Sequence, residues 1–415
     1  METGSSGNFD NIITTIDNCY FYKNNATNFG GAIYNYDNAY IWNISNNIFE
    51  ENTAENGNGG AIENAEKGSV IGTIANNQFL RNDVSKSDHD GGAIYNHGVT
   101  MTEVSGDTFT GNFAVSESGK AAGGAIYNSD SISTFSVTDL TGNYDEGTTS
   151  AIGGAIYDEG ASEITVTGDV TGNYATASSG DAYGGAICAG EGTVVTLSGN
   201  ITGNSATSTT ALGGAIYNAG TVNINIEDQD AVISGNTAVS GGTEEANVLY
   251  GEAASVTNFN LTDATLRLDD SLTGETGFEV NISGNGIDAT TFYMYNDIND
   301  SNLSIGGTTL NTMNGEVHTY NVNQFTVSGD FDMRADINLG NETMDRFVTN
   351  GNSYGEAQGT LNVSAMNVVK DTSKSGVGIY FAEPGLKEDV TSSVSDVMGP
   401  INTYTISYDK NYYGS

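Results

Sequence analysis

The first half of the chain alternates apolar and polar residues over short segments, as in Ile164–Thr167, Val194–Leu197 and Val222–Ile226. Asn-Gly and Gly-Asn pairs separate these segments and are typical of tight turns. A period of two predicts β-strands with one buried face, and no segment of this region carries the 3.6-residue period of a helix over two turns. The pattern therefore predicts short strands joined by turns.

Two motifs repeat in phase along this region. Gly-Gly-Ala-Ile occurs seven times, with successive copies 29 to 32 residues apart, and it begins at Gly30, Gly59, Gly91, Gly123, Gly153, Gly184 and Gly213. The second motif is an apolar residue, two variable residues and Asn, and it spans 21–24, 49–52, 79–82, 109–112, 140–143, 170–173, 201–204 and 233–236. Two motifs locked to one period indicate a repeat architecture, in which function lies on a surface or in loops.

The period selects a parallel β-helix with one coil of about 30 residues per repeat and about three short strands in each coil. Helical repeats lack support, because no helical period is present. Four-stranded propeller blades need about 40 residues or more, and leucine-rich repeats need a leucine ladder that this chain lacks. We expect roughly a dozen coils, the later ones less regular.

Each motif position then has an expected structural role. The glycine pair allows a tight corner with positive φ. Strand alternation directs one row of isoleucines inward (Ile33, Ile62, Ile94, Ile126, Ile156, Ile187 and Ile216) and the following position outward, where Glu63 replaces tyrosine. The apolar residues from Phe21 to Ile233 form a second inward row. The asparagines from Asn24 to Asn236 form a ladder at a bend, in which each amide bonds to the next.

The phased pair of motifs resembles the repeats of the polymorphic outer-membrane proteins of chlamydiae, and similar motifs occur in bacterial autotransporter passengers. The resemblance spans residues 19 to about 245 and implies a right-handed β-helix, displayed outside the cell and often adhesive. Such passengers are secreted through a C-terminal barrel, and neither a signal peptide nor a barrel is visible here. We therefore expect a passenger fragment, in which Met1–Gly7 is a cloning remnant.

The expected organisation has four parts. Residues 1–18 form the remnant and an N-terminal cap, and 19–249 form the regular repeats. Residues 250–348 continue the β-helix in shorter coils, with one brief helical turn at Asn341–Phe347. Residues 349–415 contain Pro384, Pro400 and a tyrosine-rich end, and they are expected to cap the exposed sheet edge.

Composition narrows the classes of partner. The chain has 12 Lys and Arg against 52 Asp and Glu, so its formal net charge is −40. Such a surface repels phosphate backbones and anionic lipids, which argues against nucleic-acid binding and membrane adsorption. No apolar stretch is long enough to span a membrane. The many carboxylates could attract Ca²⁺. Cys19 and Cys188 belong to distant coils, so we expect two free thiols.

The insertions between the asparagine and the next glycine pair vary most, with lengths of 5, 6, 8, 10, 9, 10 and 8 residues. Insertions at one phase of a solenoid project from one side, which is often the binding face, although drift in an unconstrained turn gives the same pattern. These loops are mostly small and polar, without obvious aromatic anchors. A second candidate surface is an outward row of tyrosines, which could bind a sugar or simply shield the sheet: Tyr34, Tyr95, Tyr127, Tyr157 and Tyr217.

We therefore expect an extracellular adhesin at a bacterial cell surface, which binds a glycan or protein receptor on a host or neighbouring cell. The sequence assigns no catalytic, cofactor or metal residues. The alternative is a polysaccharide hydrolase or lyase that uses paired carboxylates such as Asp269–Asp270, or Asp330, Asp332 and Asp336 beside Arg334. An ice-binding face would need regular Thr rows, which neighbouring coils interrupt. One cluster has metal-ligand residue types, and it comprises Asp88, His89, Asp90 and His97.

Overall fold

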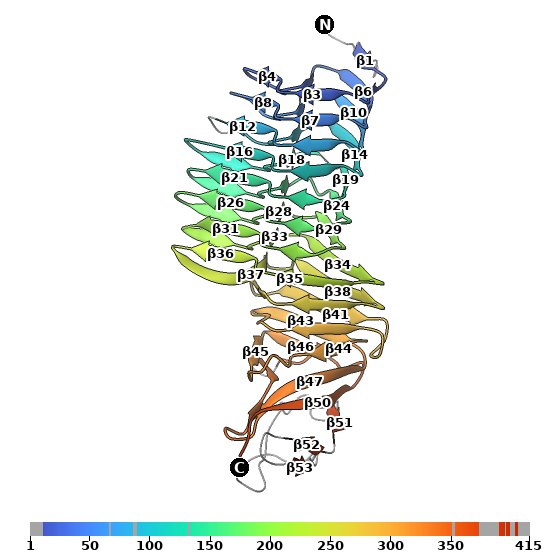
Figure 1. Cartoon of the computed structure of the whole chain (residues 1–415), viewed down its shortest axis with the longest axis vertical. Helices are drawn as coiled ribbons and strands as arrows, with labels where there is room; N and C mark the ends of the chain where they lie inside the picture. Colours follow the sequence, from blue (N-terminus) through green and yellow to red (C-terminus); the bar gives the residue numbers. More distant parts are fainter. Residues whose placement is uncertain are drawn as a thin grey trace. The chain divides into compact units, whose positions relative to one another are not determined.

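The computed structural model describes residues 11–65, 68–85, 89–131, 133–350, 353–372 and 390–394, and the backbone of 396–398 and 403–405. Every regular element in these residues is a β-strand (Figure 1). The chain divides into two compact units, the first comprising Met1–Asn223 with Ser234–Gly251 and the second Ile224–Ile233 with Glu252–Ser415. The parallel β-helix predicted from the repeats is confirmed; its right-handed sense stays an expectation.

The first unit stacks seven coils, and each coil visits four parallel sheets in the order A, B, C and D. Partner residues in adjacent coils of these seven are 28 to 32 positions apart, as for Phe21 with Phe49 and Ile94 with Ile126. Three strands per coil were expected. The additional strand belongs to sheet C. In each of these coils it contains only two to four residues, and it begins the variable insertion.

Sheet A contains β1 (Asn11–Ile13), β2 (Ile16–Asp17), β6 (Ala39–Ser45), β10 (Val70–Ala75), β14 (Thr100–Ser105), β19 (Thr134–Val137), β24 (Glu163–Val166) and β29 (Val194–Leu197). Sheet B contains β3 (Tyr20–Tyr22), β7 (Ile48–Glu50), β11 (Gln78–Leu80), β15 (Thr108–Thr110), β20 (Leu140–Thr141), β25 (Val170–Thr171) and β30 (Ile201–Thr202).

Sheet C contains β4 (Asn25–Ala26), β8 (Thr53–Ala54), β12 (Asp83–Ser85), β16 (Phe113–Val115), β21 (Tyr144–Gly147), β26 (Tyr174–Ala177) and β31 (Ser205–Ser208). Sheet D contains β5 (Ile33–Asn35), β9 (Ile62–Asn64), β13 (Ile94–His97), β18 (Ile126–Ser129), β23 (Ile156–Asp158), β28 (Ile187–Ala189) and β33 (Ile216–Asn218). The strands of sheet C lie on the left in Figure 1 and those of sheet A on the right.

Both predicted core rows are present. The isoleucines of the Gly-Gly-Ala-Ile motif pair along sheet D and are buried from Ile33 to Ile216. The phenylalanines of sheet B stack, with ring centroids 4.7 to 4.9 Å apart from Phe21 to Phe109. Apolar side chains at one phase therefore form continuous columns, which bury a thin core with few residues per coil.

The two glycines of each pair are needed for different reasons. The first has a positive φ in every copy, for example +67° at Gly153. The second lacks a positive φ, but a Cβ on Gly154 would lie 2.2 Å from the carbonyl oxygen of Gly185 in the next coil and 2.3 Å from that of Tyr174. The first glycine permits the left-handed corner, and the second permits close approach of neighbouring coils.

The asparagine ladder is confirmed. Each side chain from Asn52 to Asn204 donates its Nδ2 hydrogens to the next Asn Oδ1 and to the carbonyl of an apolar residue in the preceding coil. The sequence did not predict two further ladders at other corners, Asn47–Asn77–Asp107 and Asn35–Asn64–Asn96–Asn128–Asp158. Three corners of the coil thus satisfy buried backbone groups through stacked amides.

The insertions of coils four to seven are ordered arches. Each continues from sheet C, turns, and returns as a strand of a fifth sheet, E, whose strands are β17 (Lys120–Ala122), β22 (Ser150–Ile152), β27 (Asp181–Tyr183) and β32 (Thr210–Leu212). We call this projecting double layer of sheets C and E the fin. The next insertion ends differently, because Gly241 and Gly242 form the turn of an antiparallel hairpin between β36 (Thr237–Ser240) and β37 (Thr243–Gly251).

The second unit has shorter coils, as expected for residues 250–348. Partner residues are mostly 18 to 26 positions apart, as for Thr291 with Thr309 and Thr265 with Thr291. One sheet contains β38 (Val256–Thr262), β41 (Phe278–Gly284), β43 (Ser301–Gly306) and β46 (Gln324–Val327). Another contains β35 (Asp230–Ser234), β39 (Thr265–Leu268), β42 (Thr291–Met294), β44 (Thr309–Asn311), β47 (Phe331–Asn338), β50 (Leu361–Lys370) and β51 (Val390–Ser392).

The expected helical turn at Asn341–Phe347 is wrong. That segment contains the short antiparallel strand β48 (Thr343–Met344) and the start of β49 (Arg346–Thr349), which pairs with β45 (Thr319–Val322). Pairing with neighbouring strands outweighed the local pattern. Of the remaining boundary predictions, residues 1–10, Pro384, Pro400 and 406–415 lie outside the described residues, so the two caps stay predictions.

Candidate binding site on sheet C and the fin

The fin turns the variable insertions into a built surface. Its interior consists of small side chains facing one another across the two layers: Ala114 with Ala121, Ala151 with Ala175, and Ala182 with Ala206. Hydroxyls tie successive tips together, since Ser179 Oγ donates to the Thr148 carbonyl at 2.7 Å. The insertions therefore project from one side, as predicted, but as stacked strands and not as loose loops.

The fin also carries the aromatic side chains that we expected the insertions to lack. Phe113, Tyr144 and Tyr174 begin the sheet C strands of coils four to six and stack with centroids 4.8 and 4.6 Å apart. All three are half-buried, so one ring edge or face remains exposed to solvent. The expectation was wrong because each aromatic directly follows the ladder asparagine, a position that belongs to a strand.

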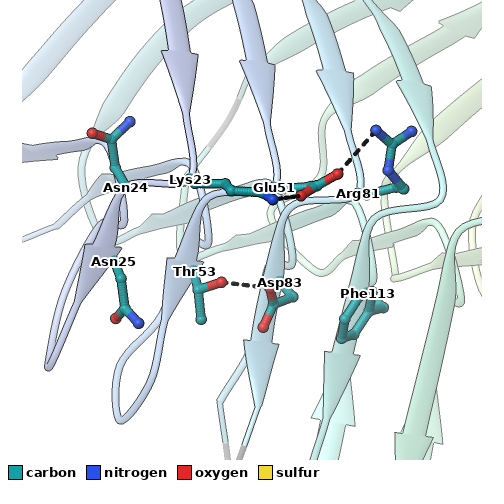
Figure 2. Close-up of a pocket in the computed structure, with 8 residues that line it drawn as sticks. All are labelled: Lys23, Asn24, Asn25, Glu51, Thr53, Arg81, Asp83 and Phe113. Atoms are coloured by element: carbon teal, nitrogen blue, oxygen red, sulfur yellow. Dashed lines mark hydrogen bonds and ion pairs between the residues drawn. The ribbon is translucent and has the colours of Figure 1, made fainter.

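A shallow hollow of about 450 Å³ adjoins the first of these rings (Figure 2). One row of its lining comes from the same position of successive sheet C strands: Asn25, Thr53, Asp83 and Phe113. The Thr53 hydroxyl donates to Asp83 Oδ1 at 2.6 Å. Partial burial raises the pKa of Asp83, and this hydrogen bond opposes the rise. The row thus continues from polar groups directly into the aromatic column.

A second row, of alternating charge, lines the other side of the hollow. Lys23 Nζ lies 3.2 Å from Glu51 Oε2, and Arg81 Nη2 lies 3.3 Å from Glu51 Oε1 (Figure 2). Arg81 also pairs with Glu50. The Lys23 ammonium holds the pKa of Glu51 below its usual range. The row brings two of the twelve cationic side chains of the protein to one site.

Backbone strain accompanies this charged row. Lys23, Glu51 and Arg81 have φ values of +53°, +53° and +52°, in the left-handed region that disfavours side chains. The equivalent residues of coils four to seven are glycines with φ between +61° and +65°: Gly111, Gly142, Gly172 and Gly203. Three charged side chains are therefore held in a backbone conformation for which coils four to seven use glycine.

The predicted tyrosine row is mostly packed. Tyr95 and Tyr127 stack at 4.9 Å, and Tyr127 is only 7% exposed. Burial raises the pKa values of both phenols above their usual range. Glu63 occupies the outer position in register with Tyr34 and Tyr95, as predicted, yet it is 2% exposed and accepts a hydrogen bond from the Gly30 N–H. Tyr127 and Glu63 of this row are thus buried, whereas Tyr95, Tyr157 and Tyr217 are half-buried and Tyr34 is exposed.

The candidate metal cluster is not assembled in the part of the chain that the structure describes. His97 Nδ1 lies 3.9 Å from Asp130, and within those residues no three His, Cys, Asp or Glu side chains converge. Asp88 lies outside them. Ca²⁺ binding stays a prediction. Cys19 and Cys188 are both free thiols, as predicted.

The candidate carboxylates of the second unit each have a structural partner. Asp269 accepts from Arg267 Nε at 2.7 Å, and Asp332 accepts from Asn362 at 3.0 Å. Asp330 accepts from the backbone of Thr360. Asp336 is buried and accepts the backbone N–H groups of residues 314 and 315. Arg334 lies beside them on β47.

These features define the first unit as a parallel β-solenoid of phased repeats with a projecting, partly aromatic face. The family model described as the Chlamydia polymorphic membrane protein repeat matches residues 18–36, which hold the first copy of both motifs. The chain is thus similar over that segment to a repeat of bacterial outer-membrane autotransporters. No curated protein and no solved structure matches the chain. Within the described residues, no helix is long and apolar enough to cross a membrane.

Proposed function

We propose that the first unit is an adhesive module displayed at a bacterial cell surface, and that its sheet C face binds a glycan chain of a host or neighbouring cell. The observation that carries this proposal is the continuity of the hollow beside Asp83 with the column Phe113–Tyr144–Tyr174. The repeat match supports a surface protein of the autotransporter type.

The chemistry of the face suits a neutral glycan. Sugar rings have apolar C–H faces, which pack on aromatic rings, and hydroxyl edges, which bond to amides, carboxylates and guanidinium groups. The face presents Asn25, Thr53, Asp83 and Arg81 beside Phe113. A polyanionic chain would meet the overall charge of −40, which repels it. The hollow and the aromatic column together extend across several coils, so a linear glycan chain can contact more than one coil.

Binding to a glycan array and to whole cells tests the proposal. The triple substitution K23G/E51G/R81G replaces the charged row with the glycine that coils four to seven use, so the fold is retained. The substitutions F113S and Y144S place the serine of position 205 in the aromatic column. We expect each variant to bind glycan at least tenfold more weakly, while Trp42→Ser, an exposed aromatic on sheet A, leaves binding unchanged.

Three outcomes would contradict the proposal in different ways. Cell binding without glycan binding would indicate a protein receptor. Glycan binding that survives both the triple glycine substitution and the aromatic substitutions would place the site elsewhere. The fin tips would then be tested by shortening residues 116–119 and 177–180. Absence of binding to cells and glycans would reject an adhesive role for this part of the protein.

A further inference from the structure

Lys120 and Asp90 meet where the fin joins the coils. Lys120 starts β17, and Asp90 bridges to Ala122, two residues further along that strand. The Lys120 Nζ lies 3.5 Å from Asp90 Oδ2, and the Asp90 side chain is only 14% exposed. The pair connects adjacent coils at the base of the first arch.

Aromatic rings surround the amine. The Lys120 Nζ lies 5.1 Å from the ring centroid of Tyr127 and 5.2 Å from that of Tyr157, both on sheet D. Cation–π contact with two rings fixes the long side chain in one place.

A third group, Asp145, is fully buried in the fin. Neither of its carboxylate oxygens meets the hydrogen-bond geometry with a partner in the described part of the chain, while the backbone N–H groups of Gly123 and Ile152 oppose the rise in its pKa that burial causes. Its register partners in the neighbouring coils are Ala114 and Ala175. The charges of Asp90 and Lys120 both act on Asp145. A buried carboxyl where alanine suffices is destabilising, and such a group is retained where it does chemistry.

We propose that Lys120 and Asp90 join in an intramolecular amide bond, with Asp145 as the acid–base group that assists its formation. The cross-link would tie coil three to the first arch of coil four and hold the fin against a pulling force. This inference does not depend on what the sheet C face binds.

The reaction balances without any further reagent. A proton passes from the Lys120 ammonium to the Asp90 carboxylate, which gives a neutral amine and a carboxylic acid. The amine nitrogen attacks Cγ of Asp90 and forms the C–N bond, while Asp145 relays the second amine proton to the departing hydroxyl. The C–O bond breaks, and one water leaves by the exposed side of Lys120, whose side chain is 36% exposed. The Lys120 amine and the Asp90 carboxyl group are held close together, and this proximity takes the place of chemical activation of the acid.

The mass of the intact, denatured protein tests the proposal. We expect the wild-type chain to be lighter than its sequence by one water, and we expect digestion to yield a branched peptide that joins the Asp90 and Lys120 segments. Lys120→Arg and Asp145→Ala should each reduce the cross-linked fraction at least tenfold. Lys23→Arg, at another ion-paired lysine, is the matched control and should retain the cross-link.

Asp145→Ala reproduces the residue of the neighbouring coils, so a folding defect is not expected to obscure the result. A wild-type mass equal to that of the sequence, after prolonged incubation at neutral pH, would overturn the proposal. A water loss confined to a linear peptide that contains Asp90 and Gly91 would also overturn the proposal. A succinimide formed at the Asp90–Gly91 bond removes one water as well, so it gives the same mass as the cross-link. Full cross-linking of Asp145→Ala would overturn the assisting role of Asp145.

Discussion

Coils one to three and coils four to seven of the first unit have the same core rows and the same asparagine ladder, but they differ at two surface positions. The turn residue before the ladder asparagine is charged and strained in the first group and glycine in the second. The insertion is a short connection in the first group and an arch with its own strand in the second. The hollow is lined mainly by coils one to three and reaches the transition at Phe113 of coil four.

The difference separates residues that determine the backbone from residues that are free to vary. The second glycine of each pair, the ladder asparagine and the two apolar rows are constant because a neighbouring coil contacts them directly. The turn residue and the insertion lie outside the core of the coil, so their chemistry can change without loss of the coil. Three predictions test this division, from the largest effect to the smallest.

Gly154→Ala should destabilise the protein most, by roughly 4 kcal/mol, because its Cβ would lie 2.2 Å from a backbone carbonyl of the next coil. Gly142→Ala has a positive φ but meets nothing within 4 Å, so its cost should be about 1 kcal/mol. Urea denaturation followed by circular dichroism measures both. A cost at Gly154 no larger than that at Gly142 would show that the neighbouring coils can move apart and that their close approach contributes little.

Asn112→Ala should reduce the free energy of unfolding by about 3 kcal/mol, because buried groups on both sides of the ladder lose their partners. Its side chain accepts from Asn82 and donates to Asn143 and to the Phe79 carbonyl. The exposed first rung offers the matched control: Asn24→Ala should cost less than about 1 kcal/mol in the same urea titration. A small effect at Asn112 would mean that water replaces the ladder.

Asp145→Ala should stabilise the fold by on the order of 2 kcal/mol at about pH 7, measured in a Lys120→Arg background where no cross-link can form. Burial holds the pKa of Asp145 well above its usual range. The folded state therefore binds a proton that the unfolded state has lost, so stability with Asp145 falls as pH rises above about 4. The gain from alanine should shrink as pH is lowered towards that value. A gain independent of pH would contradict a buried, titrating carboxyl.

The sequence predicted the coil, its two apolar rows, the asparagine ladder and the free thiols, because stacked repeats convert periodicity directly into contacts. It missed the sheet C strand and the fin, because alternation over two to four residues, as in Thr53–Ala54, is too short to separate from a turn. It also expected the insertions to lack obvious aromatic anchors. Phe113, Tyr144 and Tyr174 were visible as the residues after three ladder asparagines, but only the register shows that they stack.

The charged row illustrates a signal that was present and not used. Alignment of the eight apolar-x-x-Asn copies shows Lys23, Glu51 and Arg81 at the third position, where the later copies have glycine. That contrast marks a turn with positive φ at which three copies have a charged residue in place of glycine. The environment of Asp145 could not be predicted, since its burial depends on an arch that closes only when two coils stack.

The asparagine ladder also has a direction. Every Nδ2 donates toward the following coil, from Asn24 through Asn204, so the amide dipoles align along the stack and polarise one another. If recombination adds or deletes a repeat, one asparagine joins or leaves the ladder. The remaining Nδ2 to Oδ1 hydrogen bonds keep their direction. The length of the stack can therefore change in steps of about 4.8 Å, one strand spacing, while the ladder stays continuous.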